Sequence, residues 1–214
     1  GNALLKSSVK RYLEPVSELI IVPNIQPNQE ETDLVPAQAA LDKVVIKHWQ
    51  EKIPGFKDLI LRTKAMTGTM SFALGRMVRY LSSVKEKTKK GVIAFDLGGC
   101  STTLAAGLGE KSAVIDHPAW GGLPGSISDD MLEYVQQWTA EAVSREEVRQ
   151  YLCNHALVPS FVPGDAPGLA ISQAYARYRL FKVNHRLLEN FSWYPFQPGK
   201  GLIGHFEPII ASGA

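Results

Sequence analysis

The stretch that most constrains the fold of this chain is Gly91–Gly109, with the sequence GVIAFDLGGCSTTLAAGLG. Its first apolar run, Val92–Phe95, ends in Asp96, and a second apolar run follows a pair of glycines. Two such runs joined through Gly98 and Gly99 predict a β-hairpin, in which the glycines supply the positive φ angles of the turn.

The residues of this turn suit an anionic ligand. The tip consists of Gly98, Gly99, Cys100 and Ser101. Backbone N–H groups in a glycine turn can bind an anion, hydroxyl groups of Ser101 and Thr102 can add to them, and the Asp96 carboxylate can hold the water shell of a magnesium ion. The stretch therefore indicates phosphate and metal binding, although an ordinary Asp-Gly-Gly hairpin accounts for the same residues.

Composition excludes several classes of protein. The chain has 214 residues, 45% of them hydrophobic, which is enough for a sizeable core. Its 23 basic and 21 acidic residues are dispersed, so we expect neither nucleic acid nor a membrane as a partner. No apolar run reaches the roughly 20 residues of a membrane helix. Cys100 and Cys153 are isolated, which indicates a reducing, cytoplasmic location.

Hydrophobic periodicity predicts alternating helices and strands. We expect helices over residues 3–14, 36–49, 71–84, 129–138, 144–153 and 168–188, and strands over residues 17–22, 58–62, 92–95, 102–106, 112–115 and 209–211. The strand over residues 112–115 would complete a three-stranded meander with the hairpin. Ser144 and Glu147 form a capping-box pattern, and Ser212 with Gly213 reads as a turn after the last strand. The chain is therefore expected to be a mixed α/β protein and not a simple doubly wound βαβ series.

Several segments resemble the superfamily of actin-like, sugar-kinase-like and Hsp70-like ATPases. FDLGGCST resembles the second phosphate loop of these proteins, DLILRTKAMTGTMSFALGRMVRYL the strand and connecting helix that leave the first lobe, and PIIASGA the start of the adenosine loop. The resemblance implies an actin-like, ribonuclease-H-like fold. Residues 1–90 would form the C-terminal part of lobe I with the connecting helix, and residues 91–214 would form lobe II.

The resemblance also implies a site for ATP and Mg²⁺. Asp96 would be the catalytic residue and would hold the metal through water. The nucleotide would be bound by Gly98, Gly99, Cys100, Ser101, Thr102, Ser212 and Gly213, with the last two passing under the adenine or ribose. His117, Trp120 and His205 are expected in loops near this cleft, where exposure without a ligand is the commoner outcome.

A closer resemblance covers almost the whole chain. AMTGTMSFALGRMVRYL, AFDLGGCSTT and EPIIASGA are similar to segments of the glutamate-mutase accessory family called GlmL or MutL. Membership would imply an ATPase that acts as a chaperone or reactivating factor for an adenosylcobalamin-dependent mutase in the cytoplasm. The first phosphate loop of such proteins is not found here, so we expect the chain to be part of a longer protein.

The chain departs from the family pattern at several positions. Thr67–Thr69 replaces a proline-threonine-proline run, Leu104 an aspartate, and Asn184 an arginine; Ala65 and Met66 stand where Hsp70-like relatives carry an acidic residue. These residues leave open whether ATP is hydrolysed. Three functions therefore remain: an ATPase accessory factor, a small-molecule kinase of the same superfamily, and a degenerate scaffold without hydrolysis.

Overall fold

The computed structural model describes residues 3–27, 33–63, 68–85, 90–109, 111–118, 127–139, 143–190 and 204–213. The chain forms two compact units, Gly1–Ala73 and Leu74–Ala214. Most of the polar loop after residue 27, the charged connector before the hairpin and the glycine-rich loop after residue 118 lie outside the described residues. In the described part, no helix is both long and apolar enough to cross a bilayer.

The described part of the first unit is helical. Its elements are η1 (Ala3–Leu5), α1 (Lys6–Leu13), α2 (Val35–Lys52), α3 (Phe56–Thr63) and the start of α4 (Met70–Val84). The helices expected near residues 3–14 and 36–49 are thus confirmed. None of the described hydrophobic side chains before Leu74 is buried, whereas the Asp42 carboxylate is buried and accepts a 2.8 Å hydrogen bond from the Thr69 N–H group. Asp42 therefore ties α2 to the beginning of α4.

Two strands expected in this unit are wrong. Residues 17–22 have no regular secondary structure, and residues 58–62 lie within α3. Such short apolar runs do not distinguish a strand from a helical turn. Leu59 and Leu61 are exposed on α3, and Leu41 and Val44 are exposed on α2.

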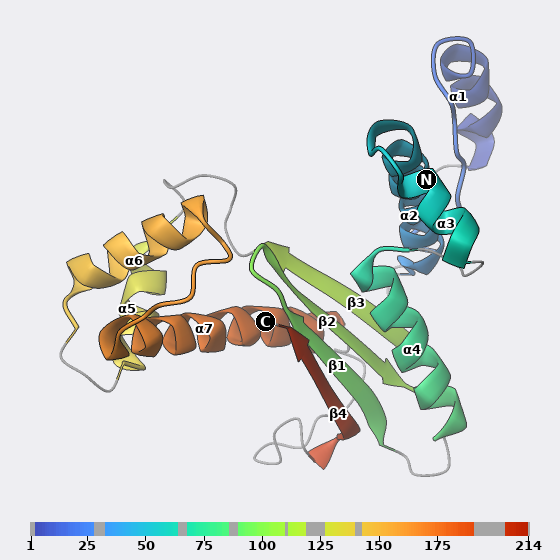
Figure 1. Ribbon diagram of the computed structural model, residues 1–214. Coiled ribbons are helices and arrows are strands. Elements are labelled where there is room, and N and C mark those ends of the chain that lie inside the picture. The colour runs from blue at the N-terminus through green and yellow to red at the C-terminus, as the bar shows by residue number, and fades with distance from the viewer. Residues whose placement is uncertain are drawn as a thin grey trace. The chain divides into compact units, whose positions relative to one another are not determined.

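The second unit contains a four-stranded mixed sheet of β1 (Gly91–Leu97), β2 (Ser101–Leu108), β3 (Lys111–Pro118) and β4 (Phe206–Gly213) (Figure 1). The strand order is β3-β2-β1-β4; β1 to β3 form an antiparallel meander, and β4 pairs in parallel with β1. The predicted hairpin and third strand are confirmed. The predicted turn conformation is wrong, because Gly98 and Gly99 are not among the described glycines with positive φ.

Each face of the sheet packs against one helix (Figure 1). Alternate residues of a strand point to opposite faces. Leu74 and Val78 of α4, which was predicted correctly, cover one face at Val92, Ala94 and Ala105. Val183 and Leu187 of α7 (Ala166–Asn190) cover the other face at Ile93, Leu104, Ala106, Leu108 and Ile115.

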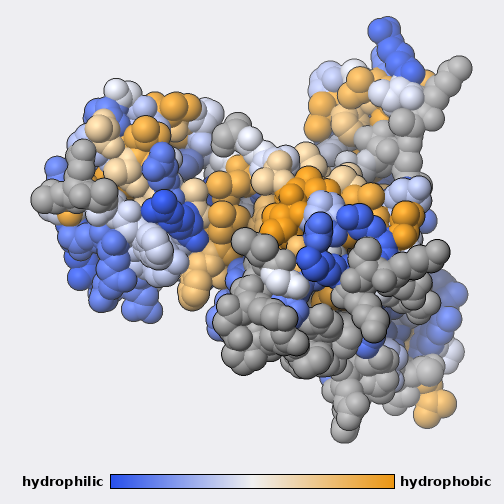
Figure 2. Space-filling model, turned by 90° about the horizontal axis from the view of Figure 1, so that it is seen from below, coloured by the Kyte–Doolittle hydropathy of each residue, from blue (hydrophilic) through white to orange (hydrophobic). Residues whose placement is uncertain are grey.

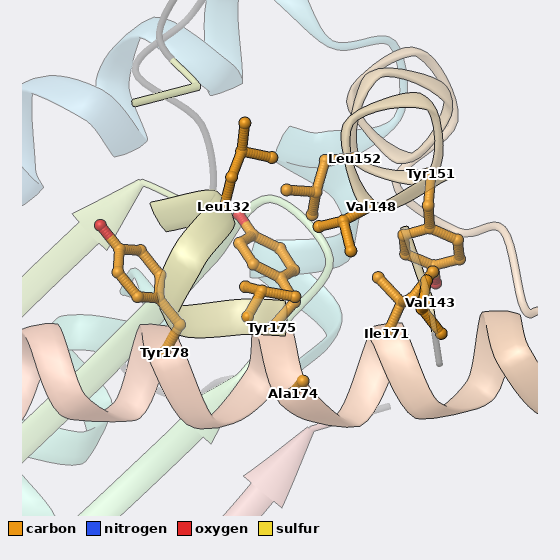
Figure 3. Packing of buried hydrophobic residues seen from close by; sticks show 10 residues of the cluster. Leu132, Val143, Val148, Tyr151, Leu152, Ile171, Ala174, Tyr175 and Tyr178 are labelled. Atoms are coloured by element: carbon orange, nitrogen blue, oxygen red, sulfur yellow. The ribbon is translucent and has the colours of Figure 1, made fainter. Parts of the chain in front are cut away.

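A further hydrophobic cluster joins α5 (Asp129–Gln137) and α6 (Arg145–Leu157) to the N-terminal half of α7. Leu132, Leu152 and Tyr175 project into it from the three helices (Figure 3). Ser128 caps α5, and the predicted capping box of α6 is confirmed. Trp138 follows α5 and is 50% exposed. In this way α7 connects the helical cluster to the sheet.

Candidate functional site

Asp96 lies in a row of polar residues that crosses the whole sheet. In the strand register Asp96 pairs with Thr103 and Ser212, and Thr103 pairs with Asp116. The Ser212 hydroxyl donates a 2.7 Å hydrogen bond to Asp96 Oδ1, and the Thr103 hydroxyl donates one of 2.6 Å to Asp116 Oδ1. Because Val92 and Ala94 pack on α4, strand alternation places the row on the α4 face. Asp96 is therefore turned toward β4 and not into the α7 core.

The turn after Asp96 is held from the side of α7. Arg179 Nη2 donates a 2.6 Å hydrogen bond to the Gly98 carbonyl oxygen. A Cβ atom at Gly99 would lie 2.7 Å from the carbonyl oxygen of Pro159, in the segment between α6 and α7. Glycine is thus required at position 99 by close approach of another backbone and not by a positive φ. Cys100 and Ser101 are exposed.

Thr102 lies on the opposite face from Asp96. Its side chain is completely buried, and its Oγ1 atom has no hydrogen-bond partner among the described residues. Strand alternation places it beside its register partner His117 on the α7 face. The hydroxyl that was expected to bind phosphate therefore belongs to the interior, unlike the exposed hydroxyl of Ser101.

Of the two histidines expected in loops, His205 lies in a turn just before β4, whereas His117 does not lie in a loop. His117 belongs to β3, and burial lowers its pKa, assisted by the charges of Arg186, Lys182 and Arg179. His205 is buried, and its carbonyl oxygen accepts a hydrogen bond from the Gly91 N–H group. Trp120 lies outside the described residues.

Ser212 and Gly213 extend β4 and do not form the turn predicted for them. Gly213 has a φ of 129°, and a Cβ atom there would lie 2.5 Å from the carbonyl oxygen of Leu97. Both conditions exclude a larger residue. The end of β4 thus lies directly against the end of β1, next to the turn.

A pocket of about 480 Å³ opens beside these strand ends. It is lined by Phe95, Leu97, Leu180, Phe181, Asn184, Ala211, Ser212 and Gly213. Phe181 is 47% exposed, and Figure 2 shows further apolar surface between the helical cluster and the sheet. Asn184 Oδ1 has no hydrogen-bond partner in the described part of the chain. The pocket therefore has mainly apolar walls, with Asn184 and Ser212 as its polar lining residues.

The acidic groups suit one kind of metal binding. The described residues include no group of three or more His, Cys, Asp or Glu side chains that could hold a metal ion. Asp96 offers a single carboxylate, of which Ser212 engages one oxygen. Magnesium keeps several waters and is often held by one or two carboxylates together with substrate phosphates. Asp96 fits a magnesium ion of that kind and not a metal bound by protein ligands alone.

Sequence reasoning missed Arg179 and Pro159, the two residues that hold the turn. Arg179 had a visible signal, since it follows Ile171 and Tyr175 at successive spacings of four and so places a cation within the apolar stripe of α7. Pro159 had none, because its contact with Gly99 depends on the path of the chain between α6 and α7.

Comparison with known proteins gives one match. A family model described as MutL protein matches residues 1–188. No curated protein and no solved structure matches the chain.

Proposed function

The chain belongs to the MutL family of glutamate mutase accessory proteins, and from that premise we propose that it is an actin-like ATPase that binds ATP with Mg²⁺. Its task would be to reactivate or remodel an adenosylcobalamin-dependent mutase. Such a protein uses ATP to change shape, so its site needs mainly to position phosphates and neutralise their charge.

The sheet topology supports this proposal. In the resemblance to actin-like ATPases, lobe II begins with a three-stranded meander, and a later strand carries the adenosine loop. The meander β1 to β3, followed by helices and by β4 in parallel with β1, has this order. The turn after β1 and the end of β4 therefore meet at one edge of the sheet, where open α/β sheets bind ligands.

The observation that carries the proposal is the hydrogen bond from Ser212 to Asp96. It joins the acidic residue of the proposed phosphate loop to the residue that begins the proposed adenosine loop, although 116 positions separate them. Two segments recognised separately in the sequence thus lie in contact, which supports the proposal that they belong to a single site.

Each group would have a distinct role. The backbone N–H groups of Gly98–Ser101 and the Ser101 hydroxyl would bind the terminal phosphates. Asp96 would orient water around the metal, and the pocket beside Gly213 would hold the base, with Asn184 as its polar contact. The bound magnesium ion would neutralise phosphate charge. The Thr102 side chain would support the hairpin from within.

One observation favours a second candidate, a nucleotide-binding scaffold without hydrolysis. Leu104 replaces the aspartate of the family pattern, and its side chain is fully buried in the core beneath α7. It therefore supplies no charge to the site. Phosphate release from ATP, measured with and without the mutase, distinguishes the two candidates.

The test is calorimetric titration of the full-length protein with Mg-ATP. We expect Asp96→Ala to weaken binding by about tenfold or more, as loss of a key electrostatic group does. The matched control is Asp116→Ala, which removes an exposed carboxylate from the same row two strands away and should leave the affinity within about twofold. Equal affinity of the wild type and Asp96→Ala would remove Asp96 from the site, and no binding by the wild type would refute the proposed function.

A further inference from the structure

Arg179 is a buried cation that the packing of the core does not explain. Its side chain is 5% exposed, and its guanidinium lies 5.6 Å from the centre of the Tyr175 ring. Burial lowers its pKa. Among the described residues no carboxylate forms an ion pair with it, and its Nε atom has no hydrogen-bond partner. A buried charge without a counter-charge destabilises a fold, and an apolar residue of similar volume would pack at less cost.

A hydrogen bond from Arg179 determines the direction of one peptide group. Arg179 Nη2 holds the Gly98 carbonyl oxygen on the side of α7. The only cis peptide bond in the described part is Glu207–Pro208, so the Gly98–Gly99 peptide is trans. In a planar trans peptide the C=O and N–H groups point in opposite directions. The Gly99 N–H group therefore points away from α7, toward the face that carries Asp96.

The segment before α7 limits the other motions of this peptide. A Cβ atom at Gly99 would lie 2.7 Å from the Pro159 carbonyl oxygen, so that backbone already fills the space beside the turn. Arg179 fixes the carbonyl and Pro159 blocks one side. The turn thus has little freedom to rotate as long as both contacts are present.

We propose that Arg179 is the positioning residue of the Gly98–Cys100 turn: it orients the Gly98–Gly99 peptide so that the Gly99 N–H group can donate to an anion, and it places a positive charge beneath that anion. The identity of the anion as a nucleotide phosphate rests on the proposed function. The orientation of the peptide does not, and it can be tested without nucleotide.

The first experiment measures the turn itself in the full-length protein labelled with ¹⁵N-glycine. We compare Arg179→Gln and Arg179→Lys with the control Arg177→Gln. Arg177 is an exposed cation on the same helix as Arg179, and its guanidinium lies over the Trp138 ring. In Arg179→Gln, the Gly99 amide signal should shift, because the charge-assisted hydrogen bond that holds the Gly98–Gly99 peptide is lost. Arg179→Lys should return the signal part of the way to its wild-type position, and Arg177→Gln should leave the signal unchanged. An unchanged Gly99 signal in Arg179→Gln would overturn the proposal.

The second experiment measures the affinities of the same variants for Mg-ATP and adenosine. Arg179→Gln should weaken Mg-ATP binding by about tenfold or more and leave adenosine binding within about twofold, since only the phosphates contact the turn. Equal loss for both ligands, or no loss, would contradict the role of Arg179. If the wild type binds neither ligand, the proposed function fails while the NMR comparison still decides the role of Arg179. Thermal melting shows whether Arg179→Gln folds. If it does not fold, the Gly99 signal and the two affinities are measured on Arg179→Lys instead.

Discussion

Some residues of this protein are required at their positions by contacts with segments that are distant in the sequence or lie across a neighbouring strand. Gly99 and Gly213 both lie where a Cβ atom would meet a backbone carbonyl, that of Pro159 and that of Leu97. Only Gly213 also has a positive φ. The same neighbourhood places His117 against the cations of α7, which makes it the residue whose ionisation reports the packing of α7 on β3.

His117 should make stability depend on pH. Burial, followed by the charges of Arg186, Lys182 and Arg179, lowers its pKa in the folded protein below the ordinary value of 6.5. As the pH falls below 6.5, the unfolded chain binds the proton first, so the free energy of unfolding decreases until the folded protein is protonated at its lower pKa. This contribution to stability is fully present above pH 6.5. Urea unfolding of the wild type and His117→Gln above and below that pH measures it.

Removing one charge tests the assigned cause. Arg186→Gln should raise the pKa of His117, as followed by NMR titration of the imidazole, but not to its full ordinary value, because burial is the larger cause. Arg177→Gln, on the same helix but over Trp138, is the control and should not move the titration. An unchanged titration in Arg186→Gln would show that the charge of Arg186 does not act on His117.

At the scale of elements, local sequence patterns predict those elements that carry their own signals. The hairpin was predicted because apolar runs flank paired glycines, and α4 because Leu74, Met77, Val78 and Leu81 have helical spacing. The strand predicted over residues 58–62 is wrong, because five residues are too few to distinguish the periodicity of a strand from that of a helix. These residues belong to α3.

In the candidate site, too, some residues can be predicted from the local sequence, and others are brought in from distant segments by the fold. Asp96 at a strand end and the glycines after it are visible in the sequence. The partners that make them a site come from distant segments: Ser212 from β4, Arg179 from α7 and Pro159 from the segment before it. Thr102 was misplaced because a strand residue next to a turn faces one side or the other according to register, which the turn conformation decides.

The capping box of α6 gives a prediction at this scale. The Ser144 hydroxyl accepts a hydrogen bond from the Glu147 N–H group, and the Glu147 carboxylate accepts one from the Ser144 N–H group. Hydrogen bonding to the Ser144 side chain, followed by that to its backbone, lowers the pKa of Glu147. Ser144→Ala should decrease the free energy of unfolding by about 1 kcal/mol. Ser83→Ala removes an exposed hydroxyl inside α4 and should change it by less than about 0.5 kcal/mol. Urea unfolding followed by circular dichroism measures both, and equal effects would mean that the cap contributes nothing to α6.

At the scale of the molecule, the two units differ in how their apolar side chains are buried. The second unit packs them on both faces of the sheet and among α5, α6 and α7. The described part of the first unit has no buried hydrophobic side chain, and Leu4, Tyr12, Leu41 and Leu61 are more than half exposed. Stability of the described structure is therefore concentrated in the second unit, and the question is where that unit begins.

The packing of α4 predicts that the second unit needs this helix in order to fold. Val92, Ala94 and Ala105 are completely buried beneath Leu74 and Val78. Removing α4 exposes this face, at about 1.5–3 kcal/mol for each large aliphatic side chain, against a total domain stability of about 5–15 kcal/mol. A chain of residues 68–214 should therefore fold, whereas a chain of residues 91–214 should not.

Circular dichroism and the dispersion of amide NMR signals compare the two chains under the same conditions. Both lack Asp42, so the hydrogen bond from Thr69 to that residue is absent in each. The difference between them reports α4 together with the exposed ion pair of Lys90 with Glu207, which as a surface pair contributes little. We expect cooperative thermal unfolding only for residues 68–214. The sheet would be independent of α4 if residues 91–214 unfolded just as cooperatively. The second unit would depend on the first if neither chain folded, because the clusters on the sheet and around α7 would then be insufficient by themselves.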